Sequence, residues 1–257
     1  MAASAVLVTR PAGQAGNLCA ALEQRGLRAV HQPLLVLEGR AHLHGSERQV
    51  VQDLDQFQHV IFISSNAVRF SMPWLEDFWP QWPLGLHWYA VGEGTARSLR
   101  RHGIEALRPV SEMNSEGLLR LPTLRELHRQ RVLLVKGEGG RELLRDTLQQ
   151  RGATVEQLAC YSRRPVTLPE GGLATLLHDQ QIDLVMLSSG EGLANMLALL
   201  RPGETSKLSR VTLLVPSQRV ADMARDAGWE RVRVADNASD DAMLQALDQW
   251  RQHRGDE

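Results

Sequence analysis

The sequence predicts an α/β protein with parallel sheets, and three observations lead to that class. The chain has 257 residues, of which 43% are hydrophobic and 23% charged, as in an ordinary globular protein of one large or two small domains. Short apolar runs alternate with segments in which apolar residues recur at helical spacing, such as Leu18, Ala21 and Leu22. Continuous apolar strands bounded by helices indicate parallel sheets covered on both faces. The expected strands are Ala5–Val8, Val60–Ile63, Trp88–Val91, Val132–Val135, Leu184–Leu187 and Val211–Val215.

An internal repeat divides the chain into two related halves of about 125 residues. LEQRG at Leu22–Gly26 returns as LQQRG at Leu148–Gly152, and FISS at Phe62–Ser65 returns as MLSS at Met186–Ser189. VGEGTARSLRRHG returns, at nearly the same spacing, as VPSQRVADMARDAG. All strand–helix units share an alternating pattern of strand, helix and glycine, which is the alternative explanation. Because the matches occur in one order at nearly one spacing, they favour duplication and predict two similar α/β lobes.

Two arrangements of these lobes fit the repeat. Sequential lobes divide near Arg129–Arg131, whereas swapped lobes require the chain to cross twice, at Leu34–Arg40 and Tyr161–Leu168. Pro33 and Pro165 adjoin or lie in the two crossing segments. Proline and the residue before it disfavour helix, so extended linkers are expected there.

Charge and cysteine content restrict the class of function. The 29 Lys and Arg residues against 30 Asp and Glu residues give a formal charge of −1, which argues against a general nucleic-acid binder. No apolar run approaches the ~20 residues of a membrane span. The first apolar stretch ends at Arg10 and is expected to be a strand, not a signal peptide. Cys19 and Cys160 form no CxxC pattern, so a reducing cytoplasm is the expected location, with both thiols in the core.

The turns after the expected strands are small, hydroxylated, glycine-rich or cationic. Ligands of parallel α/β sheets bind at the carboxyl ends of strands, where helix N-termini favour anions. Capping explains any one of these turns, because Ser, Thr, Asn and Gly are common N-caps. Taken with Arg10, Lys136, Arg141 and Arg219, they predict a cleft for a large anion. The turns are Thr9–Pro11, Ser64–Asn66, Gly92–Thr95, Lys136–Gly140, Ser188–Gly190 and Pro216–Arg219.

Familiar catalytic motifs are missing from the sequence. GEGTA and GEGG do not match GxGxxG, and GxxxxGK[ST], HExxH and GxSxG do not occur. His42 and His44 are expected in an exposed loop without a metal. The Pro73–Trp88 segment holds four of the six tryptophans and is expected to be an irregular, aromatic-packed connection, with substrate stacking as the alternative.

Seven stretches, taken in order, resemble the uroporphyrinogen-III synthase family. They extend from Leu7 to about Leu244, and their shared order and spacing make the resemblance specific although each stretch alone is modest. The stretches are LVTRPAGQAGNLCAALEQRG, VIFISSNAVRF, YAVGEGTARSLRRHGI, NSEGLL, VLLVKGEGGRELLRDTLQQRGATVEQLACYSRRP, DLVMLSSGEGLANML and VPSQRVADMARDAGW.

The resemblance implies an enzyme that converts hydroxymethylbilane, a linear tetrapyrrole, to uroporphyrinogen III. Water is lost, the ring closes and the last pyrrole is inverted, without a cofactor or metal. The implied fold has two flavodoxin-like lobes joined by a two-stranded linker with swapped connectivity. Lobe 1 then comprises residues 1–36 and 167–257, and lobe 2 residues 39–164. A cytoplasmic monomer without a nucleic-acid or membrane partner is expected.

The resemblance also assigns candidate roles to residues. Tyr161, in ACYSRRP, matches a recurrent tyrosine facing the cleft and is expected to help water depart as a general acid, with linker packing as the alternative. Thr95 matches a hydroxyl position and is the second expected catalytic residue, with helix capping as the alternative. The candidate substrate contacts are Arg10, Ser64, Ser65, Lys136, Ser188, Ser189, Ser217 and Arg219.

A different class of function stays open at this point. A non-catalytic two-lobed protein that closes on an anionic small molecule, or a degenerate copy that partners another tetrapyrrole enzyme, fits the same lobes. Spontaneous closure of hydroxymethylbilane gives the type I isomer, so formation of the type III isomer distinguishes the enzyme from both.

Overall fold

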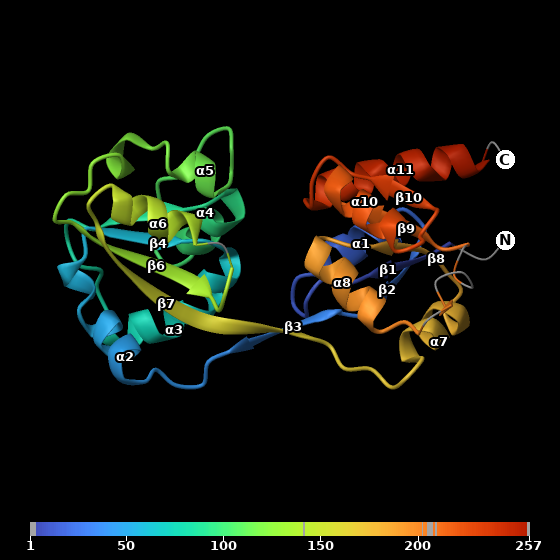
Figure 1. Ribbon diagram of the computed structural model, residues 1–257, viewed down its shortest axis with the longest axis horizontal. Helices are drawn as coiled ribbons and strands as arrows, with labels where there is room; N and C mark the ends of the chain where they lie inside the picture. The colour runs from blue at the N-terminus through green and yellow to red at the C-terminus, as the bar shows by residue number, and fades with distance from the viewer. Residues whose placement is uncertain (1–3, 141, 202, 205–207, 209, 256–257) are drawn as a thin grey trace. The chain divides into compact units, whose positions relative to one another are not determined.

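The computed structural model describes residues 4–140, 142–201, 203, 204, 208 and 210–255. The chain divides into two compact units (Figure 1). Unit 1 comprises Met1–Leu37 and Arg164–Glu257, and unit 2 comprises Glu38–Arg163. The chain passes between units at two places, within strands β3 (Leu35–Gly39) and β7 (Thr154–Pro165).

Unit 1 contains a five-stranded sheet in the order β10-β9-β8-β1-β2, with parallel pairing throughout. The strands are β1 (Ala5–Val8), β2 (Arg28–His31), β8 (Ile182–Met186), β9 (Thr212–Val215) and β10 (Val232–Val234). The helices are α1 (Gly16–Gln24), α7 (Gly172–Asp179), α8 (Gly190–Ala198), α10 (Gln218–Asp226) and α11 (Asp240–Gly255).

Alternate residues of the central strands of unit 1 face opposite layers of helices. Leu7 and Leu213 are buried in a cluster with residues of α7, α8 and α10. Val6 and Leu214 are buried in a second cluster with residues of α1 and α11. Each apolar strand is therefore covered on both sides, which is why its sequence is a continuous apolar run.

Unit 2 contains a five-stranded sheet in the order β3-β7-β6-β4-β5, in which β7, β6, β4 and β5 pair in parallel. The other strands are β4 (His59–Phe62), β5 (His87–Ala90) and β6 (Arg131–Gly137). The helices are α2 (Gly45–Gln52), α3 (Ser65–Phe78), α4 (Glu93–Arg100), α5 (Ser115–Leu118) and α6 (Leu143–Gln150), with 3₁₀ turns at η1 (Leu54–Gln56) and η2 (Pro122–Leu124).

The two sheets have matching strand orders. The run β9-β8-β1-β2 of unit 1 corresponds to β5-β4-β6-β7 of unit 2, and an isolated parallel bridge between Tyr89 and Leu107 stands where β10 pairs with β9. Unit 1 follows the strand order 2-1-3-4-5, whereas unit 2, counted along the chain as β4, β5, the Leu107 bridge, β6 and β7, follows the order 3-2-1-4-5. Both are orders of doubly wound sheets, in which ligands bind where the strand order reverses. That point lies between β1 and β8 in unit 1 and between β6 and β4 in unit 2.

The six strands expected from the apolar runs are confirmed, but the tryptophan-rich segment is more regular than expected. Helix α3 continues through Pro73 to Phe78, because its buried face, including Val68, Met72 and Leu75, holds it against the sheet beyond the proline. Trp88 lies in β5, so only the connection between these two elements is irregular. Trp79 and Trp82 anchor it: their indole nitrogens donate to carbonyl oxygens of other segments, 2.7 and 3.1 Å away.

The two cysteines differ in burial. Cys160 is buried as expected, whereas Cys19 is only half-buried, because it lies on the side of α1 next to the buried positions Leu18 and Leu22. Among the described residues, no helix is both long and apolar enough to cross a membrane.

Candidate functional site

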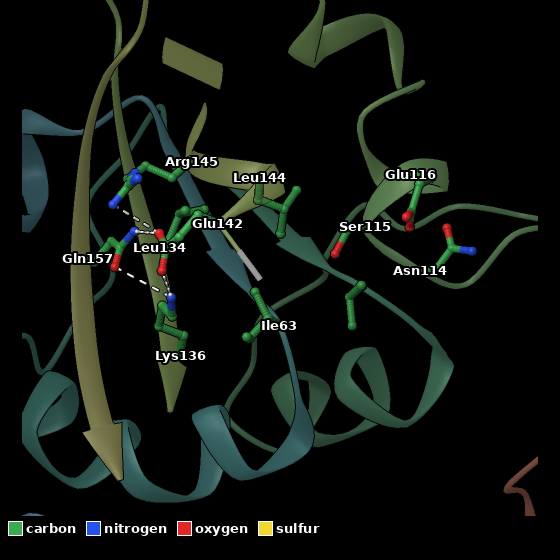
Figure 2. Close-up of a pocket in the computed structure, with 11 residues that line it drawn as sticks. Ile63, Asn114, Ser115, Glu116, Leu134, Lys136, Glu142, Leu144, Arg145 and Gln157 are labelled. Carbon is green, nitrogen blue, oxygen red and sulfur yellow. Dashed lines mark hydrogen bonds and ion pairs between the residues drawn. The ribbon is translucent and has the colours of Figure 1, made fainter. Parts of the chain in front are cut away.

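Unit 2 places a small pocket at the carboxyl ends of its central strands (Figure 2). The cavity has a volume of about 290 Å³. Its walls come from the ends of β4, β5 and β6 and from the first turns of α5 and α6. The lining residues are Ile63, Val91, Asn114, Ser115, Glu116, Leu134, Lys136, Glu142, Leu144, Arg145 and Gln157.

Lys136 is the buried charge of this pocket. The sequence predicts it in a turn, but β6 extends to Gly137, so Lys136 belongs to the strand and the turn starts at Glu138. The alternation of the strand puts Lys136 on the same face as Leu134. Only 7% of its side chain is exposed, and a buried ammonium needs a partner to offset its desolvation.

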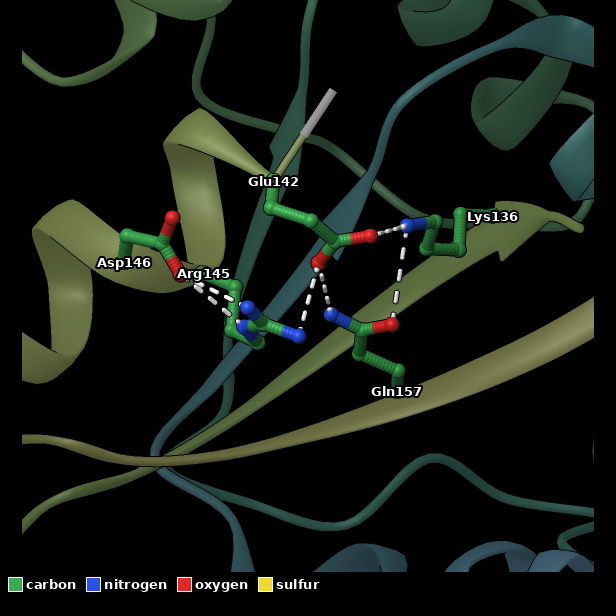
Figure 3. A network of polar contacts seen from close by, with 5 residues as sticks. All are labelled: Lys136, Glu142, Arg145, Asp146 and Gln157. Atoms are coloured by element: carbon green, nitrogen blue, oxygen red, sulfur yellow. Dashed lines mark hydrogen bonds and ion pairs between the residues drawn. The ribbon is translucent and has the colours of Figure 1, made fainter. Parts of the chain in front are cut away.

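Glu142 supplies that partner (Figure 3). Its Oε1 lies 3.1 Å from the Lys136 Nζ, and its Oε2 accepts a hydrogen bond of 2.9 Å from the Gln157 amide. Arg145 adds an ion pair of 3.1 Å. The hydrogen bonds from Gln157 and Lys136 lower the pKa of the Glu142 carboxyl below its usual range. The pocket thus already holds one carboxylate with three donors.

Tyr161 reaches the same edge of the sheet from β7 through an irregularity in the strand. Lys136 pairs with Ala159 but Gly137 pairs with Tyr161, so one extra residue, Cys160, bulges from β7. The backbone on both sides fixes this bulge: the Glu138 N–H donates to the Tyr161 carbonyl at 2.8 Å, and the Arg40 N–H donates to the Cys160 carbonyl at 3.2 Å. Bulges redirect side chains at sheet edges and next to active sites.

The Tyr161 hydroxyl meets Ser64 at the start of α3. The two side-chain oxygens are 3.3 Å apart, and Ser64 Oγ also accepts a hydrogen bond of 3.0 Å from the Ala67 N–H as the N-cap of the helix. The Tyr161 ring is 5% exposed and stacks on Phe70. Two of the predicted residues, 97 positions apart, are therefore in hydrogen-bonding contact.

The other predicted residues of unit 2 have separate surroundings. Thr95 is buried in the first turn of α4, where Gly92 occupies the N-cap position, so capping does not explain the hydroxyl of Thr95. Ser65 is exposed at the first position of α3. Arg141 lies outside the described residues.

Unit 1 presents its predicted residues at the ends of β1, β8 and β9. Ser189 caps α8, accepting a hydrogen bond of 3.0 Å from the Gly192 N–H, and Ser188 is half-buried beside it. Ser217 takes the N-cap position of α10 without a side-chain cap, and Arg219 is exposed in the first turn.

Arg10 is the more fully occupied of the two predicted cations of unit 1. Its guanidinium forms an ion pair with Asp240 and donates a hydrogen bond of 2.7 Å to the Ala238 carbonyl. It therefore joins the end of β1 to the start of α11, and within unit 1 the exposed Arg219 is the more accessible of the two cations.

Sequence reasoning missed the residues that surround Lys136. Glu142 is the N-cap residue of α6, Arg145 lies in the first turn of that helix, and Gln157 lies on β7. One of the seven stretches contains all three, but nothing in its sequence marks them as partners of Lys136. The one available signal was the lysine itself, because a charge at the end of the apolar run VLLV must find a buried partner. Across the described parts of the chain, no group of three or more His, Cys, Asp or Glu side chains is arranged to hold a metal ion.

Comparison with known proteins gives a consistent result along almost the whole chain. The family model described as uroporphyrinogen-III synthase HemD matches residues 17–245. The uroporphyrinogen-III synthases of Escherichia coli (strain K12) and Salmonella typhimurium (strain LT2) are each 34% identical to the chain, over 94% of its length and 99% of theirs.

Solved structures agree at the level of the fold. A mutant uroporphyrinogen III synthase from the extremely thermophilic bacterium Thermus thermophilus superposes with a TM-score of 0.63 at 21% identity, covering 98% of this chain and all of the other. The uroporphyrinogen-III synthetase of Helicobacter pylori 26695 gives a TM-score of 0.61 at 16% identity, covering 97% of this chain and all of that one.

Proposed function

The chain belongs to the uroporphyrinogen-III synthase family of enzymes, and we propose that it converts hydroxymethylbilane to uroporphyrinogen III with Tyr161 as the general acid. The match of the family model to residues 17–245 carries the assignment of the activity. The contact between the Tyr161 and Ser64 hydroxyls, 3.3 Å apart at the carboxyl edge of the sheet, supports the role of Tyr161. A non-catalytic anion-binding protein is not favoured by this family membership.

The reaction asks little covalent chemistry of the protein. The hydroxymethyl oxygen takes up a proton and leaves as water. Its departure is assisted by the nitrogen lone pair of the pyrrole that carries the hydroxymethyl group. The resulting azafulvene is attacked by the substituted carbon of the last ring, giving a spiro intermediate that fragments and closes again with that ring inverted. The protein must hold the linear chain folded and deliver the first proton.

Tyr161 suits the proton delivery. A tyrosine hydroxyl both donates and accepts hydrogen bonds. Tyr161 is buried, and its ring stacks on Phe70 with 5.3 Å between ring centres. Burial limits competition from water at the leaving oxygen. Thr95, buried in the first turn of α4 at the same edge, is proposed to assist through its hydroxyl.

The many carboxylates of the substrate need complementary sites, and both units offer them. In unit 2 the pocket beside Lys136 has a volume of about 290 Å³, which suits a part of a tetrapyrrole, since pockets for whole ligands have volumes of ~300–1,000 Å³. Lys136 is proposed to contact a substrate carboxylate there, less strongly because Glu142 already pairs with its charge. Ser64 and Ser65 add the N-terminus of α3. Unit 1 is proposed to bind further carboxylates at the helix starts near Ser188, Ser189 and Ser217. Arg219 is proposed to contribute there, and Arg10 to a lesser extent.

The proposal includes the finer architecture expected from the sequence. The units act as two flavodoxin-like lobes with β3 and β7 as a two-stranded linker, residues 1–36 and 167–257 forming one lobe and residues 39–164 the other. The adjacency of β3 and β7 and the unit boundaries within both strands support this division. The enzyme is proposed to work as a cytoplasmic monomer, and light scattering of the purified chain tests its oligomeric state.

Isomer analysis tests the proposed activity and the proposed acid together. The wild-type protein, supplied with hydroxymethylbilane, should yield the type III isomer above the type I background. Tyr161→Phe should lower kcat by about 10²-fold, the lower range for one general acid, with little change in melting temperature. Tyr89→Phe is the matched control, because Tyr89 is the other tyrosine of the chain and its hydroxyl contacts His59, 3.0 Å away.

The two parts of the proposal fail separately. Only the type I isomer from the wild-type protein removes the synthase activity. Unchanged type III formation by Tyr161→Phe leaves the activity in place and removes Tyr161 from the mechanism.

A further inference from the structure

We propose that Gly137 is a positioning residue for the reaction, because its missing side chain lets the Tyr161 ring cross the end of β6 and bring its hydroxyl to Ser64. The inference rests on the proposed role of Tyr161. The proposed positioning role explains why the last residue of β6 is a glycine. It also assigns a role in proton transfer to the contact between the Tyr161 and Ser64 hydroxyls.

The space at Gly137 is already filled by the tyrosine ring. A Cβ at this position would lie 2.6 Å from Tyr161 Cζ and 2.8 and 3.0 Å from the two Cε atoms. These are the atoms at the hydroxyl end of the ring, so any side chain would displace the part of Tyr161 that carries the chemistry. The backbone of Gly137 is in an ordinary strand, so a turn conformation does not explain the glycine.

The ring has little room to move aside. Phe70 stacks on it with 5.3 Å between ring centres and an angle of 28°. Phe70 is itself held against β3, since a Cβ on Gly39 would lie 2.5 Å from Phe70 Cδ1. Close packing of this kind turns a small added group into a displacement of its neighbours.

The contact with Ser64 explains why the placement of the Tyr161 hydroxyl matters for proton transfer. Ser64 Oγ accepts a hydrogen bond of 3.0 Å from the Ala67 N–H. Its own proton can then be donated to the Tyr161 oxygen, 3.3 Å away, and this leaves the phenol proton for the substrate. As that proton leaves, the donation from Ser64 stabilises the negative charge that develops on the phenol oxygen.

Gly137→Ala is the direct test, with Gly16→Ala as the matched control because a Cβ at the exposed Gly16 meets nothing within 4 Å. With only two tyrosines in the chain, ¹³C-tyrosine labelling gives two ring signals, and Tyr161→Phe assigns them. Gly137→Ala should move the Tyr161 signal, leave the Tyr89 signal in place and lower kcat by ~10-fold or more, with KM changed less.

A double variant shows whether Gly137 acts through Tyr161. If it does, adding Gly137→Ala to Tyr161→Phe lowers kcat by less than about twofold more, since both changes remove one interaction. An equal loss of kcat in the two backgrounds overturns the proposal, as does a Gly137→Ala enzyme with wild-type kcat. Full activity of Tyr161→Phe is a different result, because it removes the acid itself along with the positioning role.

Ser64 keeps the proposal testable if Gly137→Ala does not fold. Ser64→Ala removes the hydroxyl contact without added bulk and should lower kcat, whereas Ser64→Thr retains both the hydroxyl and the N-cap and should restore most of it. Equal kcat for Ser64→Ala and wild type shows that the contact has no catalytic value and overturns the proposal.

Discussion

The ion pair between Lys136 and Glu142 gives a prediction whose size follows from the geometry. The two charges are 3.1 Å apart, with 7% of the lysine side chain and 35% of the glutamate side chain exposed. Coulomb's law at this distance gives about 5 kcal/mol at an effective dielectric constant of ~20 and about 1 kcal/mol at ~80. Because the glutamate is partly solvated, we expect a coupling energy of about 2 kcal/mol.

The two single substitutions should be unequal. Glu142→Gln leaves the buried Lys136 ammonium without its charged partner, and breaking a buried pair in this way costs about 3 kcal/mol or more. Lys136→Met removes the buried charge and fills much of its volume with an apolar chain, so it should cost about 1 kcal/mol or less of the free energy of unfolding.

A double-mutant cycle measured by urea unfolding tests both statements. Tryptophan fluorescence reports mainly on unit 2, which holds Trp74, Trp79, Trp82 and Trp88. The exposed pair of Arg120 and Glu112 is the control and should show no measurable coupling. A coupling energy below about 0.5 kcal/mol for the buried pair, or a Lys136→Met variant less stable than Glu142→Gln, would refute the reasoning.

The buried residues Thr95, His59 and Cys160 each have a measurable consequence. Thr95→Ala should lower kcat more modestly than Tyr161→Phe, and a change in melting temperature alone would make Thr95 structural. Burial lowers the pKa of His59, so the unfolded chain binds more protons and the stability of unit 2 should decline as the pH drops below about 6.5; a stability that stays constant between about pH 5 and 7 contradicts this. Burial raises the pKa of Cys160 to about 12, so a thiol reagent should label the half-buried Cys19 first and Cys160 only on unfolding. Equal labelling rates in the folded protein would count against the buried placement.

The central strands were predictable because both of their faces are covered. Ala5–Val8 and Val132–Val135 are wholly buried, so each is a continuous apolar run. The strands β2 and β10 were missed because they lie at sheet edges, where RAVH and VRV retain exposed residues. Strand β7 was missed because exposed and polar residues interrupt it on the way to Pro165.

The candidate site was predictable only in part. The hydroxyls that start helices, such as Ser64 and Ser189, follow apolar runs and are visible as caps in the sequence. The contact of Tyr161 with Ser64 depends on one extra residue in β7, and a local bulge leaves no periodic trace in the sequence. The pocket of Lys136 and Glu142 depends on where α6 begins relative to β6. The sequence does not specify this start, because the N-cap position of α6 is Glu142, whose side chain forms no capping hydrogen bond.

The discontinuity of unit 1 has a consequence during synthesis. Strand β1 lies between β2 and β8, and β8 begins only at Ile182. At ~5–20 residues per second, the apolar N-terminal strand emerges on the order of ten seconds before its later neighbour exists. Unit 2 is continuous in the chain and can complete its own sheet during that interval. We therefore expect unit 2 to fold first, while the apolar strand β1 has no partner on the side where β8 later pairs with it.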